Sequence, residues 1–137
     1  MLIDKDVPAK EVHYLIRSYG AGFVHVNETR HTHNLIISPQ TLKTVWPMER
    51  IENLSLELLE PALALEPEVL LIGSGTALIF PPARLVADLL SRRIGLEVMN
   101  TASACRTYNI LATDGRHVVA ALVVAETSLP SIEQGRG

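Results

Sequence analysis

A chain of 137 residues and 15.0 kDa is long enough to form one domain around a buried core. Its composition is 47% apolar and 20% charged, with a mean hydropathy of +0.22, which excludes a largely disordered chain. The formal net charge of -3 and the scattered lysines and arginines argue against nucleic-acid binding. We therefore expect a single domain over residues 1–137, with an ordered core over about 10–126 and a flexible C-terminal tail.

The cysteine count and the N-terminal stretch indicate the compartment. Cys105 is the only cysteine, and MLIDKDVPAK lacks the apolar segment of a signal peptide, so we expect a cytoplasmic protein. The longest uncharged stretch, residues 69–83, is interrupted by two glycines and two prolines, which makes it too short and too broken to span a membrane. We do not expect an integral membrane protein.

The N-terminal third has the pattern of antiparallel strands. Residues 23–26 and 35–37 are apolar or alternating and flank a polar stretch, so they predict a hairpin. Residues 44–46 predict a further extended segment, which Pro47 ends because the residue before a proline avoids helical geometry.

The first expected helix covers residues 56–65. Ser55 is a suitable N-cap for it, and Pro61 limits or kinks it. The second half then alternates between strands and helices, with Thr101 as the expected N-cap of the last helix. These elements are expected at residues 69–72, 82–93, 96–99, 101–114 and 117–124. The alternation predicts right-handed crossovers and partly parallel pairing. The predicted fold class is therefore α/β, a single domain of N-terminal antiparallel strands followed by a β-α-β-α-β half.

Cys105 has two interpretations. Close to a helix N-terminus and next to Arg106, its thiol could have a lowered pKa and act as a nucleophile or redox group. A nucleophilic cysteine needs a base, however, and no histidine spacing indicates one. Its helical spacing with Ala102 and Asn109 fits a small core residue equally, and we prefer that interpretation.

Gly73, Ser74 and Gly75 follow the first strand of the second half, at the edge where open sheets bind ligands. A phosphate-binding motif would need a further glycine opening a helix directly, or a Gly-Lys-Ser/Thr ending, and residues 76–82 intervene instead. We prefer a tight turn and keep a small anionic ligand as an alternative.

His31 and His33 would lie on one face of a strand, and His25 on a pairing strand could join them in a metal-like arrangement. No carboxylate or cysteine with metal-ligand spacing accompanies them, so we expect a solvated loop and neither a metal nor a cofactor.

Three stretches, LLIGSG, VMNTASACRTYN and GRHVVAAL, together resemble the Mth-type family, also called adipogenesis-associated. Its mitochondrial branch is the NADH:ubiquinone oxidoreductase (complex I) assembly factor three. The resemblance covers about residues 19–124 and implies a three-layer β/β/α domain with no established catalytic mechanism. Members usually have aspartate where this chain has Asn100, which puts a carboxylate role there in doubt.

Within this family the polar stretch of the last helix is expected to be structural. Thr101, Arg106, Tyr108 and Asn109 would hold the helix against the sheet and against the glycine turn at residues 73–75. A small polar pocket where Arg106 meets that turn could hold an anion or a partner's carboxylate.

The leading functional hypothesis is a protein-interaction or assembly-factor module. Whether the protein is an enzyme is left open, and we favour the answer that it is not. The leading hypothesis implies an unidentified protein partner, leaves a homo-oligomer open, and predicts an exposed apolar surface around Trp46 or Phe80. The alternatives are a thiol-dependent enzyme or redox protein using Cys105 and an anion binder at the glycine turn.

Overall fold

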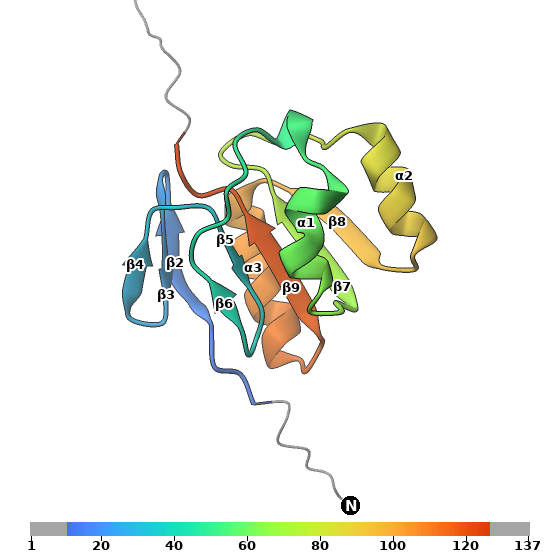
Figure 1. The fold of residues 1–137 in the computed structure, drawn as a ribbon. Helices are drawn as coiled ribbons and strands as arrows, with labels where there is room; N and C mark the ends of the chain where they lie inside the picture. The colour runs from blue at the N-terminus through green and yellow to red at the C-terminus, as the bar shows by residue number, and fades with distance from the viewer. Residues whose placement is uncertain (1–10, 127–137) are drawn as a thin grey trace, which may run out of the picture.

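The computed structural model describes residues 11–126, and Figure 1 shows the arrangement of its elements. The expected flexible tail, residues 127–137, lies outside the described residues. The strands are β2 (Ile16–Gly20), β3 (Phe23–Val26), β4 (Thr29–His31), β5 (Leu35–Ile37), β6 (Leu42–Lys43), β7 (Val69–Gly73), β8 (Gly95–Met99) and β9 (Val118–Leu122). The helices are the 3₁₀ helix η2 (Ile51–Asn53), α1 (Leu56–Leu63), α2 (Ala83–Ser91) and α3 (Thr101–Thr113).

A five-stranded sheet in the order β6-β5-β9-β7-β8 forms the centre of the domain (Figure 1). Strand β7 runs parallel to both β8 and β9, with Leu71 opposite Glu97 on one side and Ala120 on the other. Every residue of β9 is buried, as expected for a continuous apolar strand covered on both faces. The prediction of parallel strands joined by crossover helices is confirmed.

The predicted hairpin between residues 23–26 and 35–37 is wrong. Strand β3 instead pairs with β4, and the two-residue turn between them contains Asn27 at φ 52, a left-handed conformation that asparagine tolerates. Strand β5 joins the central sheet, where Ile36 lies opposite Ala121, because its three consecutive buried residues suit a strand covered on both faces. The expected extended segment at residues 44–46 is not a strand either; the short strand β6 precedes it.

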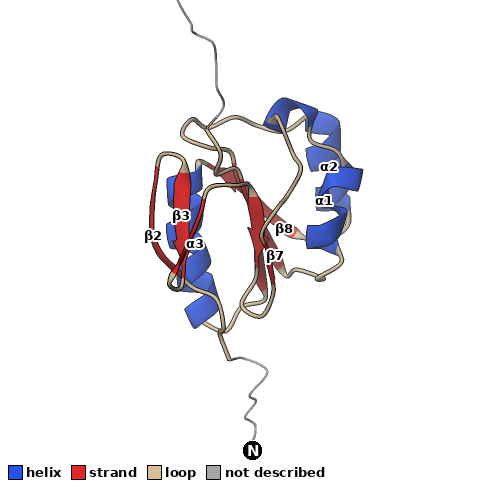
Figure 2. Cartoon of the chain, turned by 60° about the vertical axis from the view of Figure 1, so that its left-hand side comes forward, coloured by secondary structure: helices blue, strands red, loops and turns tan. Residues whose placement is uncertain are grey.

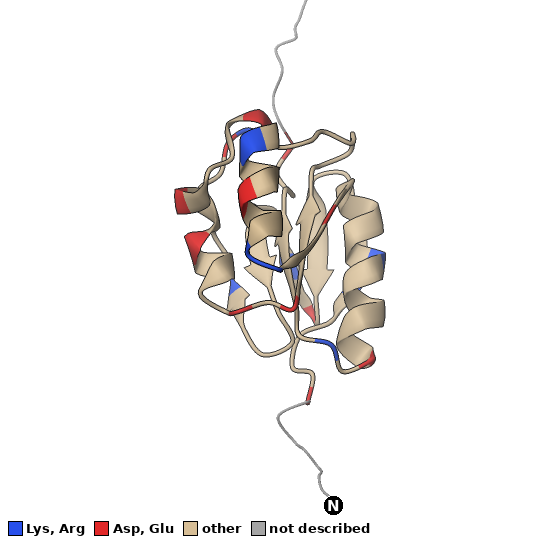
Figure 3. Ribbon diagram, turned by 90° about the vertical axis from the view of Figure 1, so that its right-hand side faces the viewer, with Lys and Arg blue, Asp and Glu red and all other residues tan. Residues whose placement is uncertain are grey.

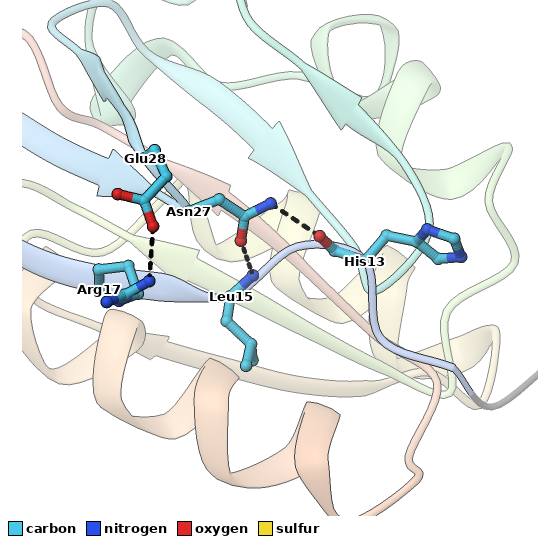
Figure 4. Close-up of polar contacts among 5 residues, drawn as sticks. All are labelled: His13, Leu15, Arg17, Asn27 and Glu28. Atoms are coloured by element: carbon cyan, nitrogen blue, oxygen red, sulfur yellow. Dashed lines mark hydrogen bonds and ion pairs between the residues drawn. The ribbon is translucent and has the colours of Figure 1, made fainter.

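The sequence patterns also missed β2, which completes a three-stranded antiparallel sheet in the order β2-β3-β4. Figure 4 shows how the β3–β4 turn holds the chain that enters β2. The Asn27 side chain accepts a hydrogen bond from the Leu15 backbone N–H (3.1 Å) and donates one to the His13 carbonyl (2.8 Å). Arg17 and Glu28 add an exposed ion pair of 2.9 Å, which contributes little because both side chains are solvated.

The elements form three layers, seen edge-on in Figure 2. The three-stranded sheet and α3 cover one face of the central sheet, and α1 and α2 cover the other. Each face has its own apolar core, so the central sheet is buried on both sides. The expected three-layer α/β architecture is confirmed, with α3 in the layer of the small sheet.

The helix termini follow the local chemistry of the sequence. The Ser55 hydroxyl accepts a hydrogen bond from the Leu58 N–H (3.2 Å) and caps α1 as predicted, and α1 continues past Pro61 to Leu63. None of the helices in the described part of the chain has the length and hydropathy that a bilayer span requires. Acidic and basic positions are interspersed on the face in Figure 3.

Candidate functional site

A groove of about 710 Å³ lies at the carboxyl ends of β7, β8 and β9. Parallel strands bring their carboxyl ends to one sheet edge, which is where α/β proteins commonly bind ligands. The β2–β3 turn, the β7–α2 loop, the start of α3 and the chain after β9 surround the groove. Most of the lining residues are small or apolar, and the one charged side chain among them is Glu126.

Thr101 joins the strand ends at this edge. Its hydroxyl donates a hydrogen bond to the Val123 carbonyl (2.7 Å) and accepts one from the Gly75 N–H (2.8 Å). The expectation that Thr101 is the N-cap of α3 is wrong, since Asn100 has the extended backbone of a cap and accepts from the Ser103 N–H (2.8 Å). Asn100 therefore supplies the helix cap with an amide oxygen, and Thr101 belongs to the sheet edge.

The glycine turn serves packing and backbone geometry. A Cβ on Gly73 would lie 2.9 Å from a Leu122 methyl carbon and 3.1 Å from the Thr101 Cα, so only glycine allows the start of α3 this close to β7. Gly75 has φ 100, which also favours glycine. The N–H of Ser74 donates to the Met99 carbonyl (2.9 Å), and that of Gly75 to Thr101. Because both N–H groups are already used, the turn offers neither of them to an anion.

Cys105 lies in the apolar core between α3 and the sheets and is 0% exposed. Burial raises the pKa of its thiol to about 12, although the nearby Arg106 acts in the opposite direction. At neutral pH the sulfur is a protonated, inaccessible thiol, which removes the physical basis for chemistry at this residue.

Tyr108 and Asn109 attach α3 to the small sheet. The Tyr108 hydroxyl donates to the Tyr14 carbonyl (2.7 Å). Asn109 accepts from the Ile16 N–H (2.9 Å) and donates to the Ile16 carbonyl (2.7 Å). Desolvation raises the pKa of Tyr108, which stays a neutral hydrogen-bond donor. These two side chains hold β2 and the residues just before it, and none of these hydrogen bonds reaches the glycine turn.

Arg106 is placed differently from the expectation. Its Nη1 donates to the Tyr19 hydroxyl (2.9 Å) and its Nη2 to the Ser103 hydroxyl (3.2 Å), and neither bond reaches the glycine turn. Tyr19 lines the groove, so Arg106, which is not itself a lining residue, lies just outside it and contacts it through Tyr19. No local pattern indicates this contact, because Tyr19 and Arg106 are 87 positions apart in the sequence.

The β7–α2 loop presents apolar side chains to solvent. The Ser74 hydroxyl is buried and donates to the Ala77 carbonyl (2.7 Å) while accepting from the Ile79 N–H (3.0 Å), which holds the loop in one shape. Leu78 and Phe80 are 54% and 63% exposed. Phe80 is therefore exposed, as its candidate role requires.

Trp46, the other residue expected on an interaction surface, belongs to the core. It is 2% exposed and its indole N–H donates to the Leu58 carbonyl (2.7 Å). Met48, two residues later, is also buried. The aromatic ring is large enough to fill the space between η2, α1 and the sheet, and its one polar atom has a partner inside.

His25, His31 and His33 are the histidines with a metal-like pattern in the sequence. Among residues 11–126, no group of three or more histidine, cysteine, aspartate or glutamate side chains could hold a metal ion. His25 contacts the Ser18 hydroxyl (2.7 Å) on the small sheet. His31 lies opposite Val24, and its Nε2 is buried without a partner among the described residues. Desolvation, aided by His25, lowers the pKa of His31. His33 is exposed.

The fold and its edge groove define a small mixed α/β domain with a preformed groove at the carboxyl ends of its parallel strands. Residues 16–123 match the family described as "Protein of unknown function (DUF498/DUF598)", and the chain belongs to that family. Its structure is similar to that of a Mth938-like domain protein from Bordetella pertussis, with 29% identity, a TM-score of 0.71, and coverage of 99% of this chain and 100% of the other. The Mth-type resemblance is confirmed.

Two named relatives extend the comparison. The "13 kDa major membrane protein" of Francisella tularensis is 29% identical over 103 residues, 74% of this chain and 84% of that protein. The "NADH dehydrogenase [ubiquinone] 1 alpha subcomplex assembly factor 3" of Danio rerio is 33% identical over 90 residues, 64% of this chain. This chain spans about half of the Danio rerio protein, 51% of its length.

Proposed function

We propose that this protein is an assembly-factor-like interaction module that binds a segment of another protein at the β7–α2 loop and the adjoining groove. The similarity to relatives named as complex I assembly factors supports the class of activity. We propose that it assists the assembly of a respiratory or other membrane complex.

The observation that carries the proposal is the fixed exposure of Leu78 and Phe80. Single exposed apolar side chains are ordinary on a protein surface. Here two of them, 54% and 63% exposed, lie in one short loop whose shape the buried Ser74 hydroxyl fixes by two hydrogen bonds. A loop that is ordered before binding loses little conformational entropy when a partner covers it.

Alternate residues of the loop line the groove and face solvent, so one partner can contact both sets. Ala77 and Ile79 line the groove, whereas Leu78 and Phe80 alternate with them in the sequence and are exposed. A partner that fills the groove and extends over the loop would thus cover Leu78 and Phe80 inside the interface. Aromatic side chains at the centre of an interface commonly contribute most of the binding free energy.

Site-specific photo-crosslinking tests the proposal. A photo-reactive phenylalanine analogue at position 80 should crosslink one defined protein in cells of the source organism. The same analogue at Leu90, which is 54% exposed on α2, is the matched control and should not capture that protein. Phe80→Ser should lower the recovery of the partner by about tenfold or more, as expected for an aromatic anchor, and Leu90→Ser should not.

Equal labelling from positions 80 and 90, or no product from position 80, would contradict the proposed surface. A product with twice the mass of the chain would identify the partner as a second copy. Light scattering of the purified protein, with and without Phe80→Ser, would then establish whether the surface supports a homo-oligomer.

We also propose a cytoplasmic location, because a lone cysteine without a disulfide is typical of a reducing compartment. The protein should remain in the soluble fraction after cell lysis at physiological salt. Recovery in a membrane fraction that resists a high-salt wash would contradict this location and would point towards the behaviour that the name of the Francisella tularensis relative describes.

A further inference from the structure

We infer that the partner segment extends from the groove past Tyr19 and presents a carboxylate to Arg106. This inference rests on the proposed function and adds the chemistry of the bound segment. The ligand class is a peptide in which an acidic side chain or a free C-terminus lies beside the apolar part that enters the groove.

The Arg106 guanidinium is held in place by neutral groups. Tyr19 and Ser103 each accept one hydrogen bond from it, and both use hydroxyl oxygens. A guanidinium has five N–H donors, so donors remain for a further acceptor. The side chain is exposed yet oriented, which lowers the entropy lost when a ligand binds it.

Arg106 also lacks a countercharge in the described part of the chain. The ion pairs among those residues use Arg17, Arg50, Arg92 and Arg116. Arg106 is, moreover, the single charged residue of α3. The planar fork of its N–H groups matches a carboxylate, which it can bind through two parallel hydrogen bonds.

The surroundings favour a peptide over a phosphate compound. The N–H groups of Ser74 and Gly75 are already used, so these two residues cannot add to a phosphate cradle. The groove is lined mainly by glycine, alanine and valine, which leaves space for an extended main chain. Ala102 lines the groove one helical turn before Arg106, so a segment that leaves the groove along α3 comes within reach of the guanidinium.

Charge also sets the position of the acidic group. Glu126, the one charged side chain that lines the groove, packs beside Gly22, where its carboxylate repels an acidic ligand. The N-terminal end of α3 carries partial positive charge near Ala102. The acidic group of the ligand is therefore expected at the α3 side of the groove and not at the side of Glu126.

Peptide display on the folded protein tests this inference. A random library of internal peptides, selected on the wild-type chain, should enrich sequences with aspartate or glutamate next to an apolar residue. Arg106→Gln should weaken the selected peptides about tenfold at low salt, as expected for loss of a partly exposed charge-assisted pair. Arg84→Gln removes an exposed arginine on α2, outside the groove, and is the matched control that should change nothing.

A double-mutant cycle then assigns the contact. Replacing the peptide's aspartate by asparagine should cost about as much as Arg106→Gln, and the two changes together should cost little more than either one. Synthetic peptides with free and with amidated C-termini distinguish a terminal carboxylate from a side chain. Inorganic phosphate at the same ionic strength as sodium chloride should not compete.

Three results would overturn the inference: no enriched peptide, enriched peptides without an acidic position, or binding that Arg106→Gln leaves unchanged. Peptides that depend on Phe80 but not on Arg106 would leave the proposed function in place and remove only the carboxylate contact. Peptides that depend on neither residue would remove both. Strong competition by phosphate would identify an anion site in place of a peptide site.

Discussion

The two sheets of this domain differ in how completely they are buried. The central sheet has apolar residues on both faces and is covered by two separate cores, so its strands are stabilised mainly by burial. The three-stranded sheet contributes to one of these cores through Ile16, Val24 and Val26. Hydrogen bonds from Tyr108 and Asn109 also attach its first strand and the segment just before it to α3. Tyr108 and Asn109 are therefore attachment points, whereas Arg106 is exposed and keeps N–H donors for a ligand. This leaves the carboxyl edge as the candidate functional surface.

The largest effect is expected for Asn109→Ala. It would leave both the N–H and the carbonyl of Ile16 without their partner, at a cost of about 2–3 kcal/mol in the free energy of unfolding. Hydrogen exchange should accelerate first in β2 to β4, while β7 and β9 keep their protection. Uniform acceleration over both sheets would contradict separate attachment of the small sheet.

Thr101→Val tests the sheet edge. The valine has nearly the same shape but leaves the Gly75 N–H and the Val123 carbonyl unpaired, which should cost about 1–2 kcal/mol in urea unfolding. Thr107→Val is the matched control, because Thr107 lies on the same helix and its hydroxyl makes no hydrogen bond among the described residues. Equal destabilisation by both variants would show that the hydroxyl of Thr101 is unimportant.

His31 gives the small sheet a pH dependence. Its folded-state pKa lies below the ordinary value of 6.5, so the unfolded chain binds the proton more readily. The stability from this residue is fully present above about pH 6.5 and decreases as the pH falls towards the folded-state pKa. Urea unfolding between pH 5 and pH 7.5 should show this slope, and His31→Gln should reduce it.

The smallest effect on stability is expected at the proposed binding surface. Leu78→Ser and Phe80→Ser change exposed side chains and should shift the free energy of unfolding by less than about 0.5 kcal/mol. Partner binding should nevertheless fall, which separates function from folding at this loop. A large loss of stability would instead show that the loop supports the core.

The sequence predicts the second half well because each element there carries its own local signal. The apolar run at β7, the prolines before α2 and the apolar run at β9 all depend on neighbours in the sequence. The first half is different, because the partner of β5 is decided by burial against β9, some 85 residues later. The sequence of a short apolar segment does not indicate which strand it will pair with.

The predicted placement of the candidate site residues is also right where the signal is local and wrong where it depends on distant parts of the chain. Phe80, in a loop between two well-predicted elements, is exposed as expected, whereas Trp46 is buried because α1 packs over it. The contact between Arg106 and Tyr19 joins the two halves of the chain. Such a contact follows from the placement of β2 beside α3, which no local pattern indicates.

The most direct test of the account is the alkylation rate of Cys105 against pH, in the folded protein and in the urea-unfolded chain. If the inner side of α3 is purely structural, the folded protein should react at least about 100-fold more slowly than the unfolded chain. Its rate should show no titration below pH 9, because burial raises the pKa of the thiol to about 12. Fast reaction of the folded protein with an apparent pKa well below that of a free thiol would contradict the account. It would place chemistry in the core of α3 and not at the carboxyl edge.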